Sequence, residues 1–120
     1  MTTQAVAVIT GGASGIGAAT ARLFGSRGYA IAILDVNQER GEKTAAALSA
    51  GGGAARFYAC DVADAKAVDG VAARVEKDLG PAEILVTSAG LIPNTESVMD
   101  MDLEAHDRMW RVNYHGTIHA

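Results

Sequence analysis

The sequence predicts an α/β fold, in which helices pack on both faces of a doubly wound parallel sheet. Short apolar runs of the kind that form buried strands alternate with longer segments in which apolar residues recur every three to four positions. Glycine or proline separates most of these segments. A chain of 120 residues that is 49% hydrophobic and 20% charged is sufficient for one globular domain.

The first strand and the first helix are expected at Ala5–Thr10 and Gly15–Arg27. The run AVAVIT is apolar almost throughout and is closed by glycines, which is typical of a strand buried on both faces. Gly28 follows the expected last turn of the helix, where a glycine commonly ends it. The spacing in this helix predicts a buried stripe formed by Ile16, Ala19, Leu23 and Phe24.

The same alternation continues along the chain. Further strands are expected at 30–34, 54–60 and 83–87, and further helices at 38–50, 65–79 and 102–120. Asn37 and Asp64 are suited to cap the second and third helices, and glycines follow both helices. The third helix has the clearest apolar stripe, formed by Val68, Val71, Val75 and Leu79.

Right-handed crossovers between consecutive parallel strands predict the strand order 3-2-1-4, the first half of a doubly wound sheet. Strand four is then an expected unpaired edge, through which two copies of the half-sheet would be able to pair. The last helix has no stop signal before Ala120. Residues 1–120 are therefore expected to form one domain that is truncated within its last helix.

Composition argues against several classes of partner. Fourteen acidic and ten basic residues give a net charge of -4 without a Lys/Arg cluster, so no nucleic-acid partner is expected. The apolar runs are short and the first residues carry no basic segment, so we expect no membrane association and a cytoplasmic protein. Cys60 is the only cysteine, which excludes an intrachain disulfide.

A glycine-rich loop joins the first strand to the first helix. In the segment TGGASGIG, Gly11 is suited to the tight turn, Gly15 to a close approach of backbone to a diphosphate, and Gly17 to close helix–strand packing. Backbone N–H groups at the helix N-terminus can bind an anion without a basic side chain. The alternative is a connection without a ligand, but the strand before and the helix after favour a Rossmann-like dinucleotide-binding loop.

Asp35 ends the second strand, eighteen positions after Gly17, close to the spacing of an acidic residue that binds the adenosine ribose. Its charge would repel a 2′-phosphate, and neither Val36 nor Asn37 supplies a cation. The predicted cofactor is therefore NAD. A surface-turn aspartate is the alternative, because aspartate is common in turns.

The spacing of the glycine motif, T-G-x-x-x-G-I-G, resembles that of the short-chain dehydrogenase/reductase family. Asp61-Val62 after strand three, Ala89-Gly90 after strand four and Val112-Asn113 in the last helix are similar to the family's next motifs, in the same order. Two adjacent positions depart from the family pattern, because Thr87-Ser88 stands where two asparagines are most frequent. This departure affects the side-chain bonds that brace the sheet more than the backbone contacts of Ser88.

The resemblance implies a role for each matching residue. Ser14 and Ile16 would contact ribose and diphosphate, Asp61 the adenine amino group, and Val62 the adenine ring through its backbone. Asp61 has an alternative role as a turn or capping residue. The predicted cofactor-binding residues are Gly11, Ser14, Gly15, Ile16, Gly17, Asp35, Val36, Asp61, Val62, Ser88, Ala89 and Gly90.

The resemblance also implies an oxidoreductase, a homo-oligomer that transfers hydride between NAD(H) and a small alcohol or carbonyl substrate. Family members use a serine, a Tyr-x-x-x-Lys pair and a helical asparagine; Asn113 matches the asparagine, as a catalytic or supporting residue. The three tyrosines, Tyr29, Tyr58 and Tyr114, are not followed by lysine four positions later. The 120 residues alone are therefore expected to be inactive, and the alternative is a non-catalytic NAD-binding module.

His115 and His119 are four positions apart, a spacing that can place two metal ligands on one helix face. No carboxylate or third ligand is evident beside them in the sequence. Surface or interface histidines are the favoured interpretation, and no metal is predicted.

Overall fold

The computed structural model describes residues 4–92 and 97–120. The strands are β1 (Val6–Thr10), β2 (Ala30–Asp35), β3 (Ala55–Ala59) and β4 (Ala82–Thr87). The helices are α1 (Gly15–Ser26), α2 (Gln38–Ala50), α3 (Ala65–Asp78), α4 (Leu103–Trp110), the π-helical turn η1 (Arg111–His115) and α5 (Gly116–His119). Each expected strand and helix is present, with ends that differ by a few residues.

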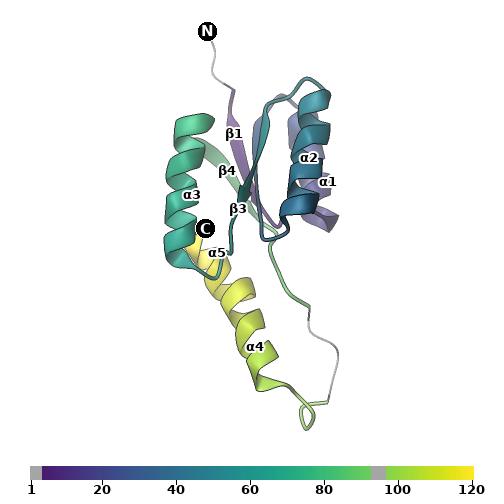
Figure 1. Ribbon diagram of the computed structural model, residues 1–120, viewed down its shortest axis with the longest axis vertical. Coiled ribbons are helices and arrows are strands. Elements are labelled where there is room, and N and C mark those ends of the chain that lie inside the picture. Colours follow the sequence, from purple (N-terminus) through teal and green to yellow (C-terminus); the bar gives the residue numbers. More distant parts are fainter. Residues whose placement is uncertain (1–3, 93–96) are drawn as a thin grey trace.

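The sheet has the order β3-β2-β1-β4 and all its strands are parallel, as the sequence predicts. Figure 1 shows α1 and α2 on one face of the sheet and α3 on the other. The α4–η1–α5 segment starts beyond the carboxyl ends of the strands and runs back towards β4 and α3. The prediction of an α/β, doubly wound half-sheet is confirmed.

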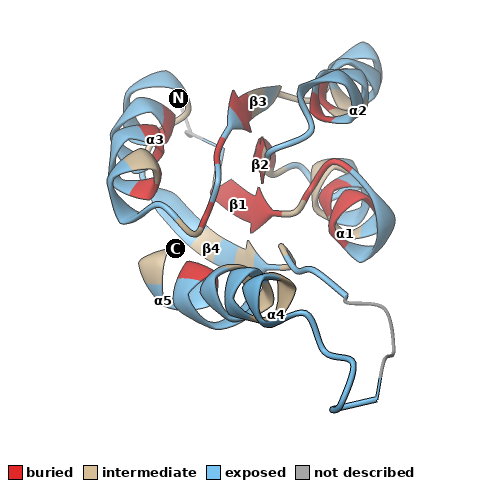
Figure 2. Ribbon diagram, turned by 60° about the horizontal axis from the view of Figure 1, so that its bottom comes forward, coloured by how far each residue is buried: buried red, intermediate tan, exposed pale blue. Residues whose placement is uncertain are grey.

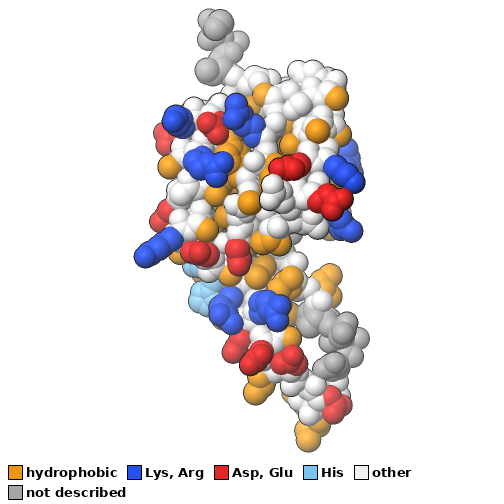
Figure 3. All heavy atoms as spheres, viewed as in Figure 1, with side chains coloured by type: hydrophobic (Ala, Val, Ile, Leu, Met, Phe, Trp, Pro, Cys, Tyr) orange, Lys and Arg blue, Asp and Glu red, His pale blue; other side chains and the backbone are white. Residues whose placement is uncertain are grey.

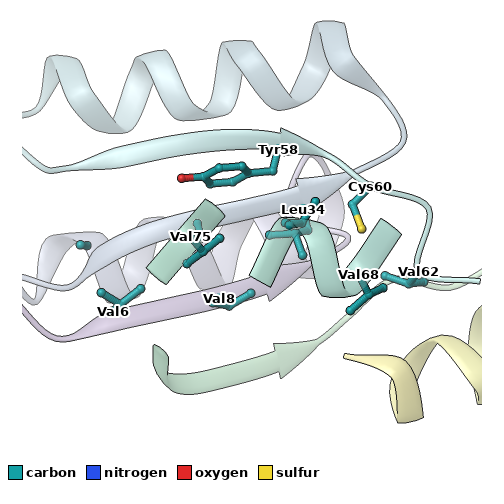
Figure 4. Close-up of a cluster of buried hydrophobic side chains, with 11 residues drawn as sticks. Val6, Val8, Leu34, Tyr58, Cys60, Val62, Val68 and Val75 are labelled. Atoms are coloured by element: carbon teal, nitrogen blue, oxygen red, sulfur yellow. The ribbon is translucent and has the colours of Figure 1, made fainter. Parts of the chain in front are cut away.

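Alternate residues of the inner strand β1 contribute to two hydrophobic clusters, one on each face of the sheet. Val6 and Val8 of β1 belong to the cluster that faces α3, which includes Tyr58, Cys60 and the valines of α3 (Figure 4). Ala7 and Ile9 belong to the cluster beneath α1 and α2. Figure 2 shows the buried residues concentrated on β1 and β2, as expected for inner strands covered on both faces.

The buried stripe predicted for α1 is wrong for Ile16, Ala19 and Leu23, which are exposed, whereas Phe24 is partly buried against the cluster beneath α1 and α2. Ile16 and Leu23 are 81% and 53% exposed, whereas Gly17, Ala18 and Ala21 are buried. At Gly17 a side chain would not fit, because an added Cβ would overlap the carbonyl oxygen of Gly11, and Ala21 belongs to the cluster beneath α1 and α2. Apolar spacing alone therefore identified only one of the four predicted residues, Phe24, correctly.

The caps and the stripe predicted for the other helices are confirmed. The Asn37 side chain accepts a hydrogen bond from Arg40 N at the start of α2, and Asp64 accepts from Lys66 N and Ala67 N at the start of α3. Val68, Val71 and Val75 are buried and Leu79 packs against them. The cap bonds of Asn37 and Asp64 satisfy backbone N–H groups that have no partner within the helix.

The segment expected as one helix from 102 to 120 is helical but not uniformly α-helical. Asp102 caps α4, and Arg111–His115 form a π turn before α5. Thr117 Oγ1 donates to the carbonyl oxygen of Asn113 (3.0 Å), so the widened turn leaves this acceptor satisfied. The apolar spacing did not indicate this turn, because the contacts that accompany it are tertiary.

Tyr58 on β3 is buried in the cluster that faces α3, and its ionisation gives the stability of the protein a dependence on pH. Its hydroxyl donates to Asp78 Oδ2 (2.9 Å), and burial together with this bond raises the pKa of Tyr58 to about 12. The neutral form is therefore favoured in the folded state, so stability is complete below about pH 10 and declines as the pH rises towards 12. Between about pH 9 and pH 11 we expect a loss of about 1 kcal/mol, which Tyr58→Phe removes. Urea unfolding at both pH values measures it, and equal losses in the two proteins would contradict it.

Candidate cofactor-binding site

The glycine loop is compact because two glycines lie against other backbone atoms. Gly11 has a φ of +67°, and a Cβ added to it would lie 2.6 Å from Ala89 N. A Cβ on Gly17 would overlap the carbonyl oxygen of Gly11. Gly15, with a φ of +56°, has no atom within 4 Å of an added Cβ, so the loop is open to a ligand on that side.

The N-terminus of α1 opens onto the same space. Ser14 is extended, makes no side-chain cap bond, and is followed by a first turn without acidic residues. Backbone N–H groups of a first turn have no partner within the helix, and they carry the positive end of the helix dipole. This helix end can therefore bind a diphosphate through its amides.

Asp35 lies at the carboxyl end of β2, beside the glycine loop. Its Oδ2 accepts a hydrogen bond from Ala13 N (3.1 Å) and its Oδ1 accepts one from Asn37 N (2.9 Å). An ionised carboxylate has about four acceptor sites, so two remain for the hydroxyl groups of a sugar. Asp35 thus orients the loop and presents a carboxylate next to it.

One hollow with a volume of about 390 Å³ brings most of the predicted site residues together. The residues that line it are Gly11, Ser14, Gly15, Ile16, Leu34, Asp35, Val36, Cys60, Asp61, Val62, Ser88, Ala89, Gly90 and Ile92. Of the predicted cofactor-binding residues only Gly17 is not among them, because it is buried behind the loop. Leu34 and Cys60 also line the hollow but were not predicted from the sequence. Each directly precedes a predicted site aspartate at the end of a strand, and this position could have identified them.

Thr10 positions the segment after β4. It is 1% exposed, and its Oγ1 accepts hydrogen bonds from Ser88 N and Ala89 N, both at 3.2 Å. Thr10 opens the glycine motif in the sequence, but no role was predicted for it, because its partners Ser88 and Ala89 lie 78 and 79 positions away. The hydroxyl joins the end of β1 to the part of the hollow that Ala89 and Gly90 line.

Asn113 holds the chain just beyond Gly90. Its Oδ1 accepts from Leu91 N (2.7 Å) and its Nδ2 donates to Leu91 O (2.9 Å), so the carboxamide pairs with both backbone groups of one residue. Asn113 lies in η1. It does not line the hollow, and its contacts are those of a residue that orients the segment after β4.

At the end of β3 the hollow is lined by the carboxylate of Asp61 and the thiol of Cys60. Asp61 Oδ1 accepts from Ala63 N (3.0 Å), which is the turn contact considered as an alternative role for this residue. Its other carboxylate oxygen, Oδ2, makes none of the hydrogen bonds described, and Asp61 lines the hollow, so this oxygen can accept a hydrogen bond from a ligand. Burial first, and then Asp61 and Asp64, raise the pKa of the Cys60 thiol, which favours its neutral form.

The two helical histidines lie close together, and one of them contacts the backbone of another segment. Their ring centroids are 6.3 Å apart, and His119 Nδ1 lies 2.7 Å from Val62 O. Residues 4–92 and 97–120 contain no cluster of three or more potential ligands from His, Cys, Asp and Glu. Across the same residues, no helix has the length and apolar character needed to cross a bilayer.

A family model described as short chain dehydrogenase matches residues 5–120. The chain belongs to the short-chain dehydrogenase family. Short-chain dehydrogenase reductase 5 of Arabidopsis thaliana is 40% identical over 111 residues, 92% of this chain and 42% of that protein. D-threitol dehydrogenase of Mycolicibacterium smegmatis is 42% identical over 112 residues, 93% of this chain and 43% of that protein. The chain thus spans less than half the length of these short-chain dehydrogenases.

Solved structures of short-chain dehydrogenases share the same architecture. NAD+-bound xylitol dehydrogenase superposes with a TM-score of 0.93 at 35% identity, over 98% of this chain and 45% of that one. L-Sorbose reductase of Gluconobacter frateurii, complexed with NADPH and L-sorbose, gives 0.89 at 33% identity, over 98% and 44%. The family comprises oxidoreductases that use nicotinamide cofactors, and these two members hold different ones.

Proposed function

We propose that residues 1–120 form an NAD-binding domain and that this domain serves hydride transfer between NAD(H) and a small alcohol or carbonyl substrate. The observation that carries the proposal is one hollow lined by both the glycine loop and the carboxylate of Asp35. Dinucleotide-binding sheets combine these two features at the carboxyl ends of their strands.

Each part of the hollow fits one part of NAD. The amides at the start of α1 would bind the diphosphate, and Asp35 would accept hydrogen bonds from the adenosine ribose. Asp61 and Val62 would border the adenine, and Ser88 to Gly90 the nicotinamide half. Bound NAD would supply a hydride acceptor, which the amino-acid side chains themselves lack.

Asn113 is proposed as the asparagine of the family's active site, acting as a supporting residue. Its pairing with both backbone groups of Leu91 favours a positioning role for the chain at the nicotinamide end. Faster exchange of the Leu91 amide hydrogen in Asn113→Ala would test this role. Unchanged exchange would exclude it.

The choice of NAD over NADP rests on Asp35. In Asp35→Ala we expect NAD to bind roughly tenfold to a hundredfold more weakly, because hydrogen bonds to a charged group are lost. The preference for NAD over NADP should be lost, because the repulsion of the 2′-phosphate is removed, whereas the loss of the Ala13 N bond affects both dinucleotides alike. Calorimetric titration of both dinucleotides measures the ratio of their dissociation constants.

Asp64→Ala is the matched control. Asp64 also accepts two backbone N–H bonds, but it lies outside the residues that line the hollow. This variant should lose about 1 kcal/mol of stability and keep the NAD preference. Equal affinity of the unmutated protein for NAD and NADP would overturn the cofactor assignment.

The second candidate is a non-catalytic NAD-binding module. The observation that favours it is that Asn113, which matches the family's asparagine, bonds to Leu91 and does not line the hollow. The two functions separate in an assay of the natural full-length protein with NAD and simple polyols, because the 120 residues alone are expected to be inactive in either case. Formation of NADH supports hydride transfer, and binding of NAD without formation of NADH supports the module. The related D-threitol and xylitol dehydrogenases make polyols the first alcohols to test.

We further propose that the protein is a homo-oligomer. Leu103, Trp110, Tyr114 and Ile118 of the α4–α5 segment are large apolar residues with at least half of their surface exposed. The rings of Trp110 and Tyr114 stack at 4.7 Å, and Figure 3 shows apolar side chains around this end of the molecule. Such a surface is typical of a subunit contact, and light scattering that finds only monomers would contradict it.

A further inference from the structure

His119 makes a contact that neither the predicted site nor the family motifs include. Its Nδ1 lies 2.7 Å from the carbonyl oxygen of Val62, and the hydrogen bond is partly buried. Val62 is 5% exposed and lines the hollow next to Asp61. The last helical segment therefore touches the part of the chain that would border the adenine.

A second contact joins the same two segments. Gly116 is buried, and a Cβ added to it would lie 2.5 Å from Val62 Cγ2. The helix backbone thus lies directly against the Val62 side chain, while His119, three residues later, holds the Val62 carbonyl. Both halves of Val62, its side chain and its backbone, are contacted from α5.

Apart from the His119 bond, the hydrogen bonds of the turn at residues 61–64 are local, and Cys60 N, directly before the turn, donates to Asp35 O (3.0 Å). Asp64 N donates to Asp61 O (3.0 Å) and Ala63 N donates to Asp61 Oδ1 (3.0 Å), and both bonds stay within four consecutive residues. These bonds shape the turn but do not place it relative to the rest of the hollow. The His119 bond spans 57 positions of the sequence and does so.

The same helical segment also holds the other end of the hollow. Asn113, six residues before His119, pairs with both backbone groups of Leu91, directly after Gly90. We propose that residues 113–119, here called the bridging segment, set the spacing between the turn after β3 and the segment after β4, with His119 as a positioning residue for the adenine half of the cofactor. This inference rests on the proposed NAD-binding function.

The acceptor in the His119 bond determines which ring nitrogen of His119 carries the hydrogen. A carbonyl oxygen only accepts, so Nδ1 must carry the hydrogen and Nε2 is left free in the neutral ring. An asparagine at this position has its Nδ2 where the histidine has Nδ1, and can donate in the same direction. A leucine has similar bulk and no donor. His119→Asn and His119→Leu therefore separate the hydrogen bond from the packing.

The binding experiment uses the full chain and two fragments of NAD as probes, ADP-ribose and nicotinamide mononucleotide. In His119→Leu we expect ADP-ribose to bind about fivefold more weakly, the effect of losing one positioning hydrogen bond. Nicotinamide mononucleotide should bind unchanged, and His119→Asn should restore ADP-ribose binding to within about twofold. Equal weakening of both fragments would indicate general destabilisation and would overturn the positioning role.

A measurement without cofactor separates this inference from the proposed function. The ¹⁵N resonances of the neutral His119 ring in the unmutated chain should show hydrogen on Nδ1. A ring protonated on Nε2 would overturn the inference even if NAD binds. If the unmutated chain binds neither NAD nor ADP-ribose, the proposed function fails, and the positioning role fails with it.

Discussion

Gly17→Ala is expected to abolish measurable NAD binding and to lower the free energy of unfolding by about 3 kcal/mol. The added Cβ would overlap the carbonyl oxygen of Gly11, and it would also lie 3.1 Å from Gly12 Cα. Both neighbours are backbone atoms of the glycine loop, so neither can move away as a flexible side chain would. Relief of the overlap requires a shift of α1 or of the loop, and either shift displaces the amides proposed to bind the diphosphate.

Urea unfolding and calorimetric titration with NAD measure the two effects of Gly17→Ala separately. Gly70→Ala is the matched control, because Gly70 lies within α3 and an added Cβ there has no atom within 4 Å. That substitution should raise stability by up to about 1 kcal/mol, the helix preference of alanine over glycine. If Gly17→Ala binds NAD as the unmutated chain does, the close approach of α1 to the loop is not required for binding.

Thr10→Val is expected to cost about 2 kcal/mol of stability and to weaken NAD binding about tenfold. Valine fills nearly the same volume, but it removes the acceptor shared by Ser88 N and Ala89 N. Ser88 N keeps a bond to the backbone oxygen of Thr10 (3.1 Å), so the Ala89 amide bears most of the loss. The segment after β4 would then be held less firmly where it lines the hollow.

Thr10→Ser separates the hydroxyl from the methyl group. It keeps the acceptor and removes one buried methyl, so its stability should fall by no more than about 1 kcal/mol. Equilibrium unfolding and NAD titration of the two variants provide the comparison. Equal stability of the serine and valine variants would show that the Oγ1 hydrogen bonds do not position Ser88 and Ala89.

Much of the fold was predictable because its signals are local. The strand order followed from the alternation of strands and helices, and the caps at Asn37 and Asp64 followed from residue type and position. The stripe of α3 was correct because its valines pack on the sheet in the usual manner. Three of the four residues predicted for the stripe of α1 were wrong, because small residues pack on this side of the helix, and hydrophobic spacing does not record that preference.

The sequence by itself determined the α/β class, the glycine loop and the carboxylate that follows β2, because each depends on residue type at a fixed short distance along the chain. Only the tertiary structure decided that Thr10 contacts Ser88 and Ala89, that Asn113 pairs with Leu91, and that His119 reaches Val62. These contacts join residues separated by 22 to 79 positions, and their geometry depends on strand order and on the π turn. No local pattern encodes such distances, because the packed sheet and helices create them.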